Sequence, residues 1–131
     1  MTTWIVPCNS KFFDIQSHLN DCDEIVWQTS SDMKPNDQVY VYVCGHAETG
    51  EIKYKGWIKE IHLSDTYVNQ NSYCIRPTKQ RKDYVLIKIE KSFSDGMFPL
   101  KELRSHGLNQ FQKQSKASAD LIEYLKNSYR G

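Results

Sequence analysis

Six consecutive residues, Gln38-Val39-Tyr40-Val41-Tyr42-Val43, alternate between valine and a larger side chain. A period of two places the three valines on one face of a β-strand and the two tyrosines on the other. We therefore predict a strand here, with the valine face in the core and the tyrosine face lining the opposite surface.

Shorter apolar runs predict the other elements. Further strands are expected over residues 3–8, 25–28, 52–63 and 84–89, and helices over 15–20, 99–106 and 118–129. The strand from residue 52 carries Ile52, Tyr54 and Ile58 in one phase, and Gly56 marks a bulge or a close backbone approach. In the last helix we expect Ala119, Ile122 and Leu125 to form the buried stripe.

This order of elements favours one α+β domain over residues 1–131. The sheet is expected to be small, strongly bent and antiparallel, forming a pseudo-barrel with peripheral short helices and a C-terminal helix. Loops and strand ends converge at the mouth of such a barrel, where small ligands usually bind. The domain is long enough to bury a core without metal or disulfide support.

Charge and cysteine content exclude several classes of protein. Seventeen basic and sixteen acidic residues give a net charge of +1, so strong nonspecific DNA binding is not expected. The cysteines Cys8, Cys22, Cys44 and Cys74 form no CxxC pair and read as reduced core thiols. No run has membrane-spanning length and no signal peptide is apparent, so we expect a cytoplasmic protein that does not contact a membrane.

Aromatic and amide side chains gather in the first part of the chain. Trp4 to Asn9 precede the pair Phe12-Phe13, and a second apolar run ends at Trp27-Gln28. A flat ring beside an amide is suited to holding and reading a nucleobase outside its stack. The group Cys44-Gly45-His46 has no nucleophile-elbow or metal-ligand spacing around it. We therefore predict a binding module, with no enzymatic activity, metal or cofactor.

The chain resembles the EVE domains of the PUA-like superfamily over most of its length, from Trp4 to about Leu125. The resemblance is carried by Trp4-Ile5-Val6-Pro7-Cys8-Asn9, Phe12-Phe13-Asp14, Trp27-Gln28 with Ser30, Asn36-Asp37 before Val39-Tyr40-Val41-Tyr42, and Gly107-Leu108-Asn109-Gln110. The family's turn usually reads Gly-Asp, and Asn36 is a substitution that left-handed geometry tolerates. The resemblance implies a small β-barrel that recognises modified bases in DNA or RNA, notably a flipped 5-methylcytosine. Some members are fused to nuclease domains, so a separate nuclease or modification-system protein is an implied partner.

The resemblance also implies site residues. The base-binding candidates are Asn9, Ser10, Phe12, Phe13, Trp27, Gln28, Ser30 and Tyr42, with Phe13 and Trp27 stacking on the base and Asn9 and Gln28 reading its edge. The phosphate-binding candidates are Lys11, Lys34, Arg104 and Lys113.

Each candidate also has a structural interpretation. We assign Trp4 to the core, and tryptophan burial alone would place Trp27 there too. Phe12 and Phe13 would otherwise form a helix-capping staple, and Asn9 would satisfy loop backbone. The alternative function is a PUA-like module that binds a protein or a small ligand and no nucleic acid, which the near-neutral charge favours.

Overall fold

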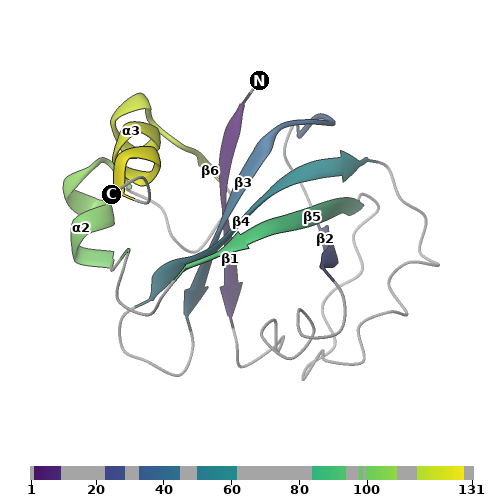
Figure 1. The fold of residues 1–131 in the computed structure, drawn as a ribbon, viewed down its shortest axis with the longest axis horizontal. Helices are drawn as coiled ribbons and strands as arrows, with labels where there is room; N and C mark the ends of the chain where they lie inside the picture. The colour runs from purple at the N-terminus through teal and green to yellow at the C-terminus, as the bar shows by residue number, and fades with distance from the viewer. Residues whose placement is uncertain are drawn as a thin grey trace.

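The computed structural model describes residues 2–9, 23–28, 33–44, 50–61, 84–93, 98, 100–108 and 115–128. The strands are β1 (Thr3–Asn9), β2 (Glu24–Gln28), β3 (Gln38–Cys44), β4 (Glu51–Glu60), β5 (Tyr84–Ser92) and β6 (Ser115–Lys116), and the helices are α2 (Leu100–Ser105) and α3 (Ala119–Ser128). The strands form one sheet in the order β2-β5-β4-β3-β1-β6, and the helices lie together beside it (Figure 1). The fold is α+β, as predicted.

The pairing of β1 with β3 corrects the expected antiparallel sheet. These two strands are parallel, with Trp4 opposite Val39, whereas the other four pairs are antiparallel. The chain leaves β1, forms β2 at the far edge and then returns beside β1, and such a crossover connection is what parallel neighbours require. Within the described residues β2 and β6 end the sheet, so the sheet of the expected pseudo-barrel is open.

The alternating side chains of the sheet pack into two separate clusters. The first cluster contains Trp4, Val6, Cys8, Ile25, Met33, Val39, Val41, Tyr54, Ile58, Val85 and Ile87. The helix-side cluster contains Ile5, Tyr40, Tyr42, Ile52, Phe93, Phe98, Leu103, Leu108, Leu121 and Leu125. The predicted alternation of β3 is confirmed, but its tyrosines do not line a surface: Tyr40 and Tyr42 are 0% and 1% exposed under the helices.

A bulge in β4 puts Ile52 and Tyr54 on opposite faces of the sheet, although the sequence pattern predicted the same face for both. The register shifts where Val41 pairs with Tyr54 and Tyr42 pairs with Ile52. Since an extra residue reverses the alternation of a strand, Tyr54 joins the first cluster and Ile52 the helix-side cluster. The irregularity predicted at Gly56 is confirmed by a second register shift beside it, between β4 and β5.

The predicted stripe of the C-terminal helix is confirmed at Leu125 but not at Ala119 or Ile122, and Leu121 is buried instead. Leu121 and Leu125 are 1% and 0% exposed, and Ala119 is exposed. The helix begins after Ser118, whose Oγ accepts a hydrogen bond from the backbone N–H of Leu121 at 3.2 Å, as an N-cap residue does. Gly107 ends α2 in a left-handed conformation, with φ of 98°, as predicted.

Some sequence predictions fall outside the described residues, including the helix at 15–20 and the cysteines Cys22 and Cys74. Cys8 is 1% exposed in the first cluster, which confirms its assignment to the core. In the described part of the chain, neither helix has the length and apolar character needed to span a membrane.

Candidate functional site

Trp27 lies near the C-terminal end of β2, where several strands begin or end. It pairs with Val85 at the start of β5, while Ile58 near the end of β4 exchanges backbone hydrogen bonds of 2.8 Å with Asn36 and Asp37. We call this region, comprising Trp27, the turn at residues 34–37, Ile58 and Val85, the Trp27 end of the sheet. Trp27 is half-buried and packs against the first cluster, so its ring is fixed on one side by the core.

The turn at this end owes its shape to two residues of the sequence. The backbone N–H of Asp37 donates to the carbonyl of Lys34 at 3.1 Å, and Asn36 at the third position has φ of 74°. Pro35 supplies the second position, and a turn with positive φ at the third position favours glycine or asparagine. The left-handed geometry expected for Asn36 is therefore confirmed.

A buried carboxylate fastens this turn to the first strand. Asp37 is 5% exposed and accepts three hydrogen bonds, from the Trp4 indole N–H at 3.0 Å, the Thr2 backbone N–H at 3.1 Å and the Lys34 backbone N–H at 3.0 Å. Burial opposes ionisation, but these donors and the charge of the N-terminus outweigh it and lower the pKa of Asp37. An ionised side chain thus holds the turn beside β1.

Trp27 and Tyr42 are the only predicted base contacts whose side chains the structure describes, and it does not bring them together. Trp27 packs against the first cluster, whereas Tyr42 is buried in the helix-side cluster on the other face. The Tyr42 ring also fills the space beside Gly50, where a Cβ would lie 2.3 Å from it. Tyr42 therefore supports the core in this structure, and we leave it out of the site.

The backbones of Asn9 and Gln28 end β1 and β2, and only their main chains are described. By register, Asn9 pairs with Cys44, while Gln28 pairs with Tyr84 at the other end of the sheet. Strand pairing thus gives no direct link between these two predicted amides. Ser10, Phe12, Phe13 and Ser30 lie outside the described residues.

The predicted phosphate contacts are also separated. Lys34 is exposed in the turn at the Trp27 end, whereas Arg104 is exposed on α2, on the helix side of the sheet. Lys11 and Lys113 lie outside the described residues. Of the described pair, only Lys34 belongs to the same end as Trp27.

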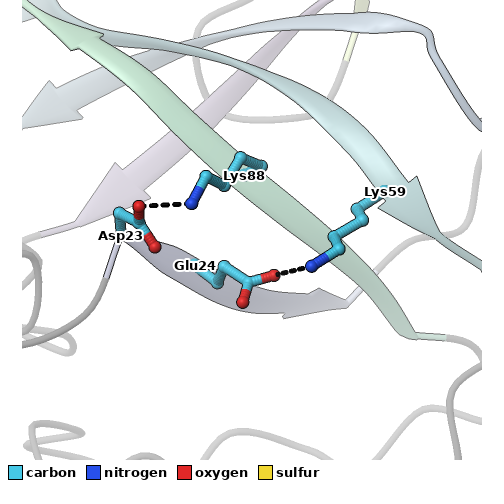
Figure 2. A network of polar contacts seen from close by, with 4 residues as sticks. All are labelled: Asp23, Glu24, Lys59 and Lys88. Carbon is cyan, nitrogen blue, oxygen red and sulfur yellow. Dashed lines mark hydrogen bonds and ion pairs between the residues drawn. The ribbon is translucent and has the colours of Figure 1, made fainter.

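Sequence reasoning missed two ion pairs that hold β2 in place. Lys88 of β5 donates to Asp23, and Lys59 of β4 donates to Glu24 at 2.9 Å, so both pairs converge on the start of β2 (Figure 2). The hydrogen bond from Lys88 lowers the pKa of Asp23, and the bond to Glu24 raises the pKa of Lys59. The sequence offered only the adjacent acids Asp23-Glu24 before a strand as a signal, since their partners depend on strand order.

The described residues contain no group of three or more His, Cys, Asp or Glu side chains able to hold a metal ion. What they provide at the Trp27 end is a half-buried aromatic ring, a rigid turn and an exposed lysine. A half-buried ring can stack on a planar group, and an exposed lysine can pair with an anion.

Similarity to known proteins is found at the level of structure. No protein-family model and no curated sequence matches the chain. A hypothetical protein from Leishmania major superposes with a TM-score of 0.66 at 15% identity, over 99% of this chain and 96% of the other. Human THYN1, in complex with DNA containing 5-methylcytosine, superposes with a TM-score of 0.65 at 13% identity, over 97% and 96%.

The chain has a PUA-like fold. A third structure, ASCH from Zymomonas mobilis, is similar with a TM-score of 0.61 at 8% identity, over 96% of this chain and 94% of the other. The PUA-like fold expected from the sequence is thus confirmed. Because all these identities are low, the likeness concerns the fold and not the residues of a site.

Proposed function

We propose that this chain is an EVE-type domain and a non-catalytic nucleic-acid-binding module that recognises a modified base of the 5-methylcytosine type. The observation that carries the proposal is the full-length structural likeness to human THYN1, whose structure contains DNA with 5-methylcytosine. The sequence resemblance to EVE domains, drawn from residues alone, leads to the same class of ligand.

Trp27 is the proposed stacking ring. Its packing against the first cluster supports this role, because a ring already held by the core loses little freedom when a base stacks on it. Stacking contributes about 1–3 kcal/mol per base and tolerates every base. Discrimination must therefore come from polar groups at the base edge, for which Asn9, Ser10, Gln28 and Ser30 stay our candidates, with Phe12 and Phe13 as further rings.

The near-neutral charge limits how such a module binds. With a net charge of +1, few phosphates are neutralised, so the affinity should depend only shallowly on salt. Lys34, which is exposed in the turn at the Trp27 end of the sheet, is the candidate phosphate contact. Selectivity for the modified base then matters more than total affinity.

A separate nuclease or modification-system protein is the proposed partner.

Binding to matched oligonucleotides tests this proposal. Fluorescence anisotropy would compare single- and double-stranded DNA and RNA carrying plain, 5-methylated or 5-hydroxymethylated cytosine, at two salt concentrations. We expect one modified probe to bind at least about tenfold more tightly than its plain counterpart, which corresponds to about 1.4 kcal/mol. Equal binding of all probes would overturn the proposal for these modifications.

One observation favours a second function, a module that binds a protein or a small ligand without nucleic acid. Lys55, Lys59 and Lys88 each form an ion pair with a carboxylate of the chain, so they offer little free positive charge to phosphates. Such a module would bind a free modified nucleoside, or a protein, with an affinity that salt leaves unchanged, and would bind no polymer.

A further inference from the structure

We propose that the ion pairs Asp23–Lys88 and Glu24–Lys59 are positioning contacts that set the register of β2 and thereby the placement of Trp27. The inference rests on the proposed function in one respect: because Trp27 is the proposed stacking ring, its position matters for binding.

The strand β2 has few side chains that specify its register. It is five residues long, and in the described part of the chain it pairs with β5 alone. Its inward side chains are Ile25, which is fully buried, and Trp27, which is half-buried. A slip of one residue would turn both away from the core, but a slip of two residues would keep inward positions inward. Alternation alone therefore does not exclude the two-residue slip.

The two ion pairs favour the observed register over that slip. A slip of two residues moves each carboxylate about 6.6 Å along the strand and away from its observed contact with a lysine. The contact of Glu24 with Lys59 is 2.9 Å, and the backbone N–H of Ile89 donates to the Asp23 carbonyl at 2.7 Å beside the other pair. Both carboxylates thus meet their partners in the observed register.

Lys59 reaches β2 although β5 lies between their strands. The register of β4 against β5 shifts between Ile58 and Glu60, which leaves Lys59 as the extra residue of a bulge. Bulges redirect side chains, and in Figure 2 the Lys59 side chain extends from β4 toward Glu24 at the start of β2. The pair therefore ties together three strands, β2, β5 and β4.

The side chains of both ion pairs are partly exposed, which indicates that the pairs act mainly by orienting β2. Asp23 is 61% exposed, Lys59 44%, Lys88 33% and Glu24 28%. Pairs that are so accessible to water add little to global stability. Breaking one should therefore leave the unfolding midpoint nearly unchanged while Trp27 samples more than one position.

A charge exchange with a matched control tests the inference. Glu24→Lys breaks the pair with Lys59, and the double variant Glu24→Lys/Lys59→Glu restores it with the original net charge. Glu90→Lys makes the same charge change and breaks the Lys55–Glu90 pair, which joins β4 to β5 without touching β2. Should Glu24→Lys fail to fold, Glu24→Gln removes the pair without placing two lysines together.

The primary measurement is ¹⁹F NMR of protein labelled with 5-fluorotryptophan, with the signals of Trp4, Trp27 and Trp57 assigned by single Trp→Phe variants. We expect Glu24→Lys to shift or broaden the Trp27 signal, the double variant to restore it, and Glu90→Lys to leave it unchanged. An unchanged Trp27 signal in both Glu24→Lys and Glu24→Gln would overturn the inference.

Binding provides the second measurement, as the ratio of the affinities for a 5-methylated and a plain probe. Glu24→Lys should reduce this ratio about two- to fivefold, in line with the strength of an exposed pair, and the double variant should recover it. A wild-type protein without methyl preference would contradict the proposed function alone, because the fluorine measurement needs no nucleic acid. A reduced ratio in Glu90→Lys equal to that in Glu24→Lys would contradict the positioning role.

Discussion

The indole N–H of Trp4 donates a hydrogen bond of 3.0 Å to Oδ2 of Asp37, across 33 residues of sequence, and both side chains are buried. This bond connects β1 to the turn that precedes β3, and β3 is the parallel neighbour of β1. The bond thus ties β1 to the end of the connection that leads into β3, at the Trp27 end of the sheet.

A double-mutant cycle should detect this bond. Trp4→Phe and Asp37→Asn should each lower the free energy of unfolding by about 1–3 kcal/mol, because the first removes a buried hydrogen bond to a carboxylate and the second removes the charge that strengthens the three bonds to Asp37. The double variant should be less destabilised than the sum by about 1 kcal/mol or more, since the two residues are in contact. Denaturant unfolding gives all three values.

Trp57→Phe serves as the control, because Trp57 belongs to neither cluster. Additive effects of the two substitutions would argue against the bond.

The lowered pKa of Asp37 predicts a pH dependence of stability. A carboxyl whose pKa is lower in the folded than in the unfolded state stabilises the fold above its unfolded value, near 3.8, and this contribution is lost as the pH falls through the folded value. The stability difference between wild type and Asp37→Asn should therefore be largest near neutral pH and shrink below about pH 4. Unfolding curves of both proteins between pH 2.5 and 7 measure it. A difference that stays constant with pH would show that ionisation of Asp37 contributes nothing.

Gly56 is the glycine that β4 needs for packing against β5. A Cβ at this position would lie 2.3 Å from the backbone oxygen of Lys88, which cannot move without disturbing the strand. We expect Gly56→Ala to destabilise the protein by about 1–3 kcal/mol. Thermal unfolding compares it with Glu60→Ala, an exposed change in the same strand; equal effects would mean that the two strands accommodate the methyl group.

The sequence predicted those features that depend on local pattern. The Val–Tyr alternation located β3, and the glycines at 56 and 107 marked a strand irregularity and a helix end. These succeed because a period of two and positive φ are properties of a few adjacent residues. The buried position of Trp4, at 4% exposure, also followed from residue type.

What the sequence missed depends on tertiary arrangement. The parallel pairing of β1 with β3 arises from a crossover, and the opposite placement of Ile52 and Tyr54 arises from a bulge that no local signal reports. The alternation of β3 predicted that its tyrosines line a surface, but residues of α2 and α3 cover them. The pairing of Glu24 with Lys59 likewise needs the strand order β2-β5-β4.

The most direct test of the proposed function is the ratio of dissociation constants for a plain and a 5-methylcytosine oligonucleotide, measured by anisotropy for wild type and Trp27→Leu. Leucine keeps apolar contact with the first cluster and removes the stacking ring, and circular dichroism confirms that the variant is folded. Wild type should favour the methylated probe by about tenfold or more, and Trp27→Leu should reduce the ratio toward one. A wild-type ratio of one for every probe, or an unchanged ratio in a folded Trp27→Leu variant, would contradict modified-base recognition at Trp27.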